Sequence, residues 1–207
     1  MATEEPKRFL VAVGVENYKE ARSWGRLTQV PHELDQIVGL LTDARFEARH
    51  ILRSVSRRPR KEPFRRAIHD WAVNPHRRAD DHLILYWTGH GAVTSDNLYL
   101  VLPDTTSVQR DGLKLNDVVE TLLSPESKCG PVLLLLDLCF AGTGALDVAD
   151  RLKTMTRDRP SARPPQIAVI AATRARDEAD QGVFAAAFKA AVEELIDPSN
   201  PSSWLAP

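Results

Sequence analysis

Short apolar runs alternate with longer segments of helical periodicity along most of the chain. Near-continuous apolar runs, typical of strands buried on both faces of a parallel sheet, lie at residues 9–15, 82–87, 132–136 and 167–172. A less apolar run at 46–52 predicts a strand nearer a sheet edge, and 97–102 predicts a short strand pair or one arm of a hairpin. Apolar side chains at helical spacing predict helices over 31–43, 64–73, 113–123, 145–155 and 183–196. Strands that alternate with helices in this way predict an α/β fold with a mostly parallel sheet.

Length, charge and composition limit the classes of protein to which the chain can belong. The 207 residues suit one domain, which we expect to span 1–196, followed by a tail or linker at 197–207. Because 27 basic residues nearly balance 28 acidic ones, we expect no nucleic-acid partner. The N-terminus carries no apolar signal segment and no run is long enough to cross a membrane, which predicts a cytoplasmic protein without a membrane partner. Two cysteines close together in sequence give no disulfide framework.

A candidate nucleophile follows the apolar strand 132–136. Asp137 and Cys139 come just after this strand, before small residues at 141–144 that predict a turn into the helix 145–155. Open α/β sheets bind ligands at the carboxyl ends of their strands, and the start of a helix lowers the pKa of a thiol. We therefore take Cys139 as a candidate nucleophile; the alternative is a buried cysteine that acts only as a small apolar side chain. Cys129, in a polar loop, is expected to be non-catalytic.

A nucleophilic thiol needs a base, and one of the six histidines is suitably placed. His90 follows the predicted strand 82–87 and lies between Gly89 and Gly91, which allow unusual backbone angles and the close approach of a substrate main chain. Its separation of 49 residues from Cys139 leaves room for one crossover between neighbouring strands. The other five histidines lack glycine neighbours on both sides, and we expect them to be surface or structural residues.

The segments around these two residues resemble a known family. YWTGHGA around His90 and LDLCFAGTG around Cys139 are similar to the two catalytic motifs of the caspase and metacaspase clan of cysteine peptidases. Looser similarity extends over most of residues 8–195. The resemblance implies a caspase-like three-layer α/β/α sandwich and a cysteine endopeptidase in which His90 and Cys139 form the catalytic dyad. It also implies that the backbone N–H groups of Gly91 and Cys139 form the oxyanion hole.

Two carboxylates are candidates for substrate binding. In metacaspase-like members an aspartate at the place of Asp137 lines the primary specificity pocket and pairs with Arg or Lys, whereas caspases carry a glutamine there. A carboxylate in a partly dry pocket binds a guanidinium and repels an acidic side chain, so we predict cleavage after Arg or Lys. Asp180 is our choice for a second acid from the cluster Asp177, Glu178 and Asp180. Alternatively, Asp137 is a strand-end carboxylate that caps a backbone N–H. For Asp180 the alternative is a place in a solvated acidic loop.

Competing functions are a nucleotide-binding domain, a thiol phosphatase and a caspase-like binding or scaffold domain. The first requires glycine patterns that the sequence does not contain. The second requires an arginine about six residues after its cysteine, and this residue is missing. The third stays open, because the family usually has a further strand after the helix matching 183–196, and a site without that strand could be latent until a partner docks. The lack of a convincing further strand also favours a monomer, or a fragment of a larger protein, over caspase-like dimers, which pair through that strand.

Partners and processing follow from the resemblance. We expect a protein or peptide substrate, a sensor or regulatory domain as a further partner, and an effector role in bacterial cell death or antiphage defence. No cofactor is expected and no metal site is visible, although calcium activation, known in some metacaspase-like members, stays open. Residues 156–166 have the composition of a linker, and self-cleavage after Lys153 or Arg157 is a further hypothesis.

Overall fold

The core of the fold is a five-stranded parallel sheet. The computed structural model describes residues 5–44, 47–54, 60–95, 97–128, 130–158, 166–173 and 179–195. The strands are β1 (Arg8–Val15), β2 (Glu47–Ser54), β3 (His82–Thr88), β7 (Val132–Asp137) and β8 (Ile167–Ala171), in the spatial order β2-β1-β3-β7-β8. Every neighbouring pair is parallel, so all five carboxyl ends lie along one edge. The predicted parallel α/β fold is therefore confirmed, including the position of the second strand at an edge.

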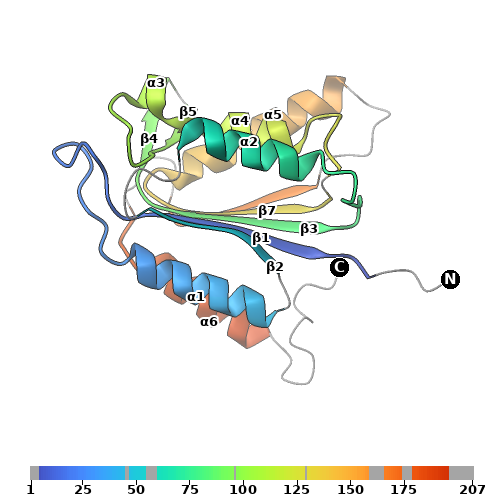
Figure 1. Ribbon diagram of the computed structural model, residues 1–207, viewed down its shortest axis with the longest axis horizontal. Helices are drawn as coiled ribbons and strands as arrows, with labels where there is room; N and C mark the ends of the chain where they lie inside the picture. The colour runs from blue at the N-terminus through green and yellow to red at the C-terminus, as the bar shows by residue number, and fades with distance from the viewer. Residues whose placement is uncertain are drawn as a thin grey trace.

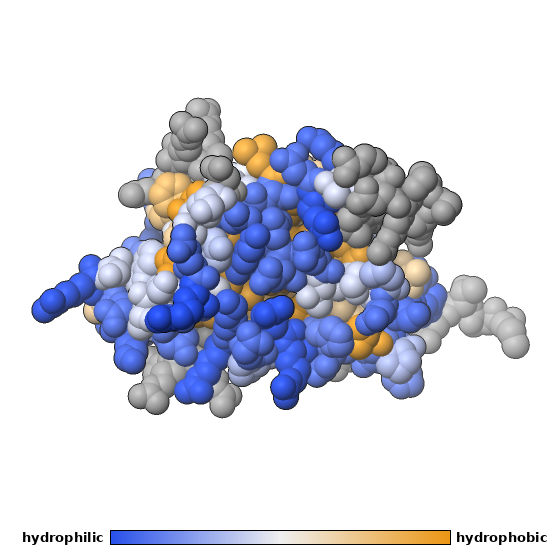
Figure 2. Space-filling model, turned by 90° about the horizontal axis from the view of Figure 1, so that it is seen from above, coloured by the Kyte–Doolittle hydropathy of each residue, from blue (hydrophilic) through white to orange (hydrophobic). Residues whose placement is uncertain are grey.

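Helices cover both faces of this sheet. α1 (Val30–Asp43) and α6 (Val183–Leu195) lie side by side on one face, and α2 (Lys61–Ala72), α4 (Leu115–Leu122) and α5 (Ala141–Asp158) cover the other (Figure 1). This is the three-layer α/β/α sandwich expected from the sequence. The outer surface on the side of α2, α4 and α5 is largely hydrophilic, with small apolar patches (Figure 2). No helix in the described parts of the chain is long and apolar enough to span a membrane.

The strands supply side chains to two apolar layers. Because successive side chains of a strand point to opposite faces, Phe9, Val11 and Val13 of β1 pack on the side of α2 and α4, whereas Leu10 and Ala12 pack against α1. Both sets are fully buried. A strand buried on both faces needs apolar residues at every position, which is why the central strands appear in the sequence as unbroken apolar runs.

A small second sheet follows β3. β4 (Gly91–Thr94), β5 (Asn97–Leu100) and β6 (Leu113–Lys114) pair antiparallel in this order, and the short helix α3 (Val108–Asp111) lies between β5 and β6 in the chain. The sequence predicted a short strand pair or one arm of a hairpin at 97–102, where β5 lies, and placed residues 113 and 114 in a helix. β4 and β6 were missed because they contain too few residues to show a period.

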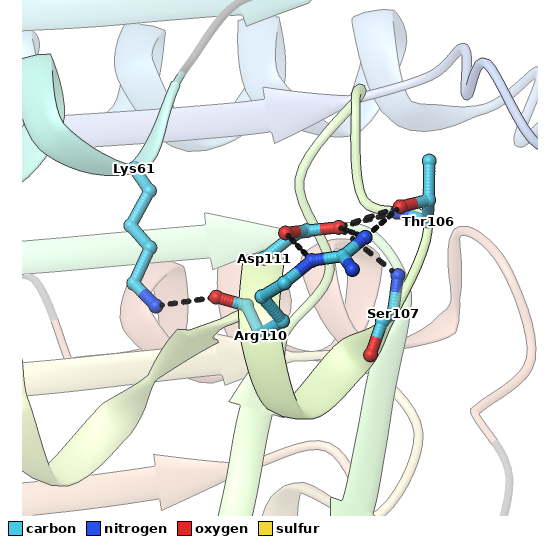
Figure 3. A network of polar contacts seen from close by, with 5 residues as sticks. All are labelled: Lys61, Thr106, Ser107, Arg110 and Asp111. Atoms are coloured by element: carbon cyan, nitrogen blue, oxygen red, sulfur yellow. Dashed lines mark hydrogen bonds and ion pairs between the residues drawn. The ribbon is translucent and has the colours of Figure 1, made fainter.

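Polar contacts hold α3 in place. The carboxylate of Asp111 accepts hydrogen bonds from the Thr106 hydroxyl (2.6 Å), the Ser107 backbone N–H (3.1 Å) and the Arg110 guanidinium (2.8 Å) (Figure 3). Hydrogen bonds from Arg110 and Thr106 hold the pKa of Asp111 well below its ordinary value. Lys61, at the start of α2, donates to the Arg110 carbonyl oxygen at 3.1 Å and so links α2 to α3.

The predicted turn at residues 141–144 is wrong, because α5 already begins at Ala141. A Cβ at Gly144 would lie 2.6 Å from Leu98 Cδ2 and 2.7 Å from Leu115 Cδ2, so this glycine allows close packing of the helix. α5 also extends to Asp158, and Lys153 and Arg157 therefore lie inside a helix. Of the predicted linker, residues 159–165 lie outside the described residues, as does Cys129.

The strand predicted as buried at 167–172 is an edge strand. β8 pairs only with β7 among the described strands, its burial alternates along its length, and the Ile170 side chain is 42% exposed. A continuous apolar run indicates a strand with apolar side chains on both faces, but it does not say how many neighbouring strands cover it. The position in the sheet is decided by contacts distant in sequence.

Candidate active site

The ends of β3 and β7 bring His90 and Cys139 to one place. The two strands are adjacent and parallel, with Thr88 opposite Asp137, and the Gly89 N–H donates to the Asp137 carbonyl oxygen at 3.3 Å. His90 follows β3 and Cys139 follows β7, so both residues leave the same edge of the sheet. They line one cavity of about 250 Å3, together with Asp137 and Asp180.

The turn after β7 presents the Cys139 thiol. Phe140 has a φ of +60°, a left-handed conformation that costs a bulky residue about 1–3 kcal/mol. The Thr173 side chain supports this turn, because its hydroxyl donates to the Leu138 carbonyl oxygen (3.3 Å) and accepts from the Ala141 N–H (3.0 Å). The thiol is thereby held, half-buried, next to the first turn of α5. Its sulfur also accepts a hydrogen bond from the Ala179 N–H at 3.4 Å.

Gly91 packs directly on the backbone of Cys139. A Cβ at Gly91 would lie 2.4 Å from the Cys139 carbonyl oxygen and 2.3 Å from Leu138 Cδ1. The first of these atoms belongs to the backbone and cannot move aside, so only glycine fits this position. The structure thus brings together the two residues whose N–H groups the sequence suggested for an oxyanion hole.

The imidazole of His90 is held in a defined tautomer. Its Nε2 lies 2.9 Å from the Gly25 carbonyl oxygen, an acceptor, so this nitrogen carries the proton and Nδ1 is left to accept one. Burial lowers the pKa of His90 below its ordinary value, against the smaller opposing effect of the bond to Gly25. A neutral imidazole with an accepting nitrogen is suited to act as a general base near neutral pH.

Two buried carboxylates meet in the same cavity. Asp137 is 5% exposed and accepts a hydrogen bond from the Tyr86 hydroxyl at 3.1 Å. Glu33, on α1, is 2% exposed and accepts from the Thr88 hydroxyl at 2.7 Å and from the Gly182 N–H. Burial, and secondarily the charge of Glu33, raise the pKa of Asp137 to about 7, against the opposing effect of the Tyr86 bond. The cavity therefore holds two buried carboxyl groups, whose proximity disfavours the ionisation of Asp137.

Glu33 was missed in the sequence, although a signal was present. It lies on α1 three residues after Val30 and four before Ile37, both buried, and so it is an acid on an apolar helix face. Asp180 also lines the cavity, but its side chain is exposed to solvent. Asp177 and Glu178, the other members of the predicted acidic cluster, lie outside the described residues.

Positive charge is scarce among the described residues that line the cavity. Neither lysine nor arginine is found in that lining, and His90 is its single histidine. Within the described part of the chain, no cluster of histidine, cysteine, aspartate or glutamate is arranged to hold a metal ion.

The fold and the site define an α/β protein with a thiol and an imidazole at adjacent strand ends of a parallel sheet. The chain belongs to the Caspase domain family (Peptidase C14), which matches residues 7–200. Members of this family are typically cysteine peptidases, and proteins are the substrates that such an activity implies. The resemblance expected from the sequence is thus confirmed at the level of the family.

Solved structures support the same fold. The chain is similar to protein GSU0716 from Geobacter sulfurreducens, with 16% identity and a TM-score of 0.60 over 91% of this chain and 83% of that one. It is also similar to caspase-1 from Spodoptera frugiperda, with 15% identity and a TM-score of 0.52 over 68% of this chain and 50% of that one. Comparison with curated protein sequences gave no significant match.

Proposed function

We propose that the protein is a cysteine endopeptidase that cleaves after arginine or lysine, with Cys139 as nucleophile and His90 as general base. The observation that carries the proposal is the acidic cavity beside the thiol. Glu33 and Asp137 are both buried there, and the described residues of the lining provide no lysine or arginine to neutralise them. A substrate side chain that brings its own positive charge would satisfy these carboxylates.

The proposed reaction uses both residues of the dyad, which line one cavity. His90 Nδ1 takes the proton from Cys139 Sγ, and the thiolate attacks the carbonyl carbon of the scissile bond. The backbone N–H groups of Gly91 and Cys139 stabilise the negative charge on the carbonyl oxygen. His90 then gives its proton to the leaving amine. Water, deprotonated by the same imidazole, hydrolyses the resulting thioester and frees the thiol.

The size and charge of the cavity support specificity for one basic side chain. Its volume of about 250 Å3 is below the roughly 300–1,000 Å3 of pockets that hold whole small molecules. Asp137 and Glu33 lie in its interior, and the exposed Asp180 adds a third carboxylate. An aspartate side chain would meet like charges here, so substrates with aspartate before the scissile bond are expected to be rejected.

The test uses fluorogenic peptides that differ only in Arg, Lys or Asp before the scissile bond. We expect cleavage of the Arg and Lys peptides only, and none by Cys139→Ala. Asp137→Asn and Glu33→Gln should each raise KM for the Arg peptide by at least about tenfold, since a charge-assisted bond contributes about 1.5–3 kcal/mol. Glu62→Gln, on the outer surface of α2, is the matched control and should change nothing. Preferential cleavage of the Asp peptide would contradict the proposed pocket.

A latent or purely binding domain is the second candidate, favoured by the contact between the Ala179 N–H and the Cys139 sulfur. This contact keeps the segment before α6 against the nucleophile, and a substrate would have to displace it. Alkylation of Cys139 by iodoacetamide separates the candidates. An active or activatable site should react faster than a free cysteine thiol at pH 7, and His90→Gln should remove this advantage. A thiol of ordinary reactivity with no peptide cleavage would favour the binding domain.

A further inference from the structure

The loop between β1 and α1, residues 16–29, contacts His90 at three points. Gly25 accepts the hydrogen bond from the imidazole, while the rings of Tyr18 and Trp24 lie 4.9 Å and 5.6 Å from the imidazole ring, centroid to centroid. We infer that Tyr18 is a positioning residue whose hydroxyl fixes the backbone of His90 and thereby aims its imidazole at Cys139. The inference rests on the proposed function, and it adds a residue that does not touch the cavity.

The Tyr18 hydroxyl uses both its donor and its acceptor capacity. It donates to the Val15 carbonyl oxygen at 2.9 Å, which directs a lone pair to the His90 backbone N–H, 2.8 Å away. Burial raises the pKa of Tyr18 above its ordinary value, so the hydroxyl keeps its proton and these two roles do not exchange. A Cβ at Gly89 would lie 2.9 Å from this hydroxyl, so the glycine before His90 makes room for it.

His90 needs such a support because glycines flank it on both sides. Gly89 and Gly91 permit the close packing around the site, but two glycines leave the intervening residue with an unusually free backbone. The hydrogen bond from the His90 N–H to Tyr18 restricts that freedom at the residue itself. Tyr18 is absent from the cavity lining, so it can act on the base without contacting substrate.

The loop is itself well anchored, which lets it transmit a fixed position. The Leu27 N–H donates to the Glu16 carbonyl oxygen at 3.0 Å, and Arg26 Nε donates to the Glu16 carboxylate at 2.7 Å, closing the loop at its base. The Lys19 N–H donates to the Pro103 carbonyl oxygen at 2.7 Å. Tyr18 therefore lies between two points at which the loop is bonded, one at its base and one at Lys19.

The test is Tyr18→Phe, which keeps the ring and removes the hydroxyl. We expect kcat for the Arg peptide to fall about tenfold with KM nearly unchanged, because the partly buried His90 N–H loses its partner and the base loses its alignment. Iodoacetamide alkylation of Cys139 at pH 7 should slow by a similar factor. Tyr99→Phe, at a half-buried tyrosine on β5 outside the site, is the matched control and should change neither rate. Thermal unfolding checks that both variants fold.

Three results separate this inference from the proposed function. If His90→Gln does not slow alkylation of Cys139, the dyad itself is wrong. If His90→Gln slows it but a folded Tyr18→Phe does not, the dyad stands and the role of Tyr18 is overturned. Should Tyr18→Phe fail to fold, hydrogen exchange of the His90 amide in the unaltered protein decides: strong protection is expected, and exchange at the rate of an open loop would overturn the inference.

Discussion

Replacing Asp137 by asparagine should stabilise the protein, and increasingly so as the pH rises. The folded protein raises the pKa of this carboxyl to about 7, whereas the ordinary value is 3.8. Between these two values the folded state holds a proton that the unfolded chain has released. The free energy of unfolding of the unaltered protein therefore falls as the pH rises through this window and levels off above it.

The magnitude follows from the size of this window. Between pH 5 and pH 8 the free energy of unfolding falls only up to about pH 7, where the carboxyl of the folded protein loses its proton. This leaves about two pH units, which correspond to a fall of about 2–3 kcal/mol. Asparagine has nearly the same shape, cannot ionise and still offers Tyr86 an acceptor. The stability of Asp137→Asn relative to the unaltered protein should therefore rise by about 2–3 kcal/mol between pH 5 and pH 8.

Urea unfolding of both proteins at pH 5, 6, 7 and 8 measures this difference in stability. Comparing the difference between pH values removes any effect of the substitution that does not depend on pH. A difference that stays constant over this range, or that shrinks as the pH rises, would refute the reasoning. The same variant should lose its preference for arginine peptides. A gain in stability coupled to a loss of specificity is expected where a site holds a charge that only its substrate neutralises.

Four further outcomes are expected. Gly91→Ala should lower kcat at least about 100-fold and destabilise the protein by about 1–3 kcal/mol. Gly39→Ala, where an added Cβ would meet no atom within 4 Å, should be neutral or slightly stabilising. The kcat/KM for an arginine peptide should fall as the pH drops through about 7, where Asp137 takes up its proton. Alkylation of Cys139 does not use the specificity pocket. Its rate should stay constant until the pH is below 6.5, because burial lowers the pKa of His90. Asp111→Asn should lower the melting temperature at pH 7, and this effect should shrink progressively as the pH falls below 3.8, since the folded protein lowers the pKa of that carboxyl.

The sequence predicted the fold because the central strands are buried on both faces. Runs such as 132–136 must then be apolar at every position, and the intervening helices show their own period. The two candidate residues Cys139 and His90 were found for a related reason. Each follows an apolar run and lies near glycines, and parallel strands place their carboxyl ends on one edge. The family resemblance that these motifs carry is confirmed over residues 7–200, whereas the roles of the single residues stay proposals.

Only the tertiary structure decided which other side chains reach the site. Glu33 comes from α1, Tyr18 from the loop after β1, and Thr173 from the end of β8, and each contacts its partner across more than 30 residues of sequence. The edge position of β8 likewise depends on which strands pair. Local patterns report the burial of a segment, because burial restricts every residue in it. They do not report which distant segment supplies a contact, because one hydrogen bond between two residues leaves no period in either.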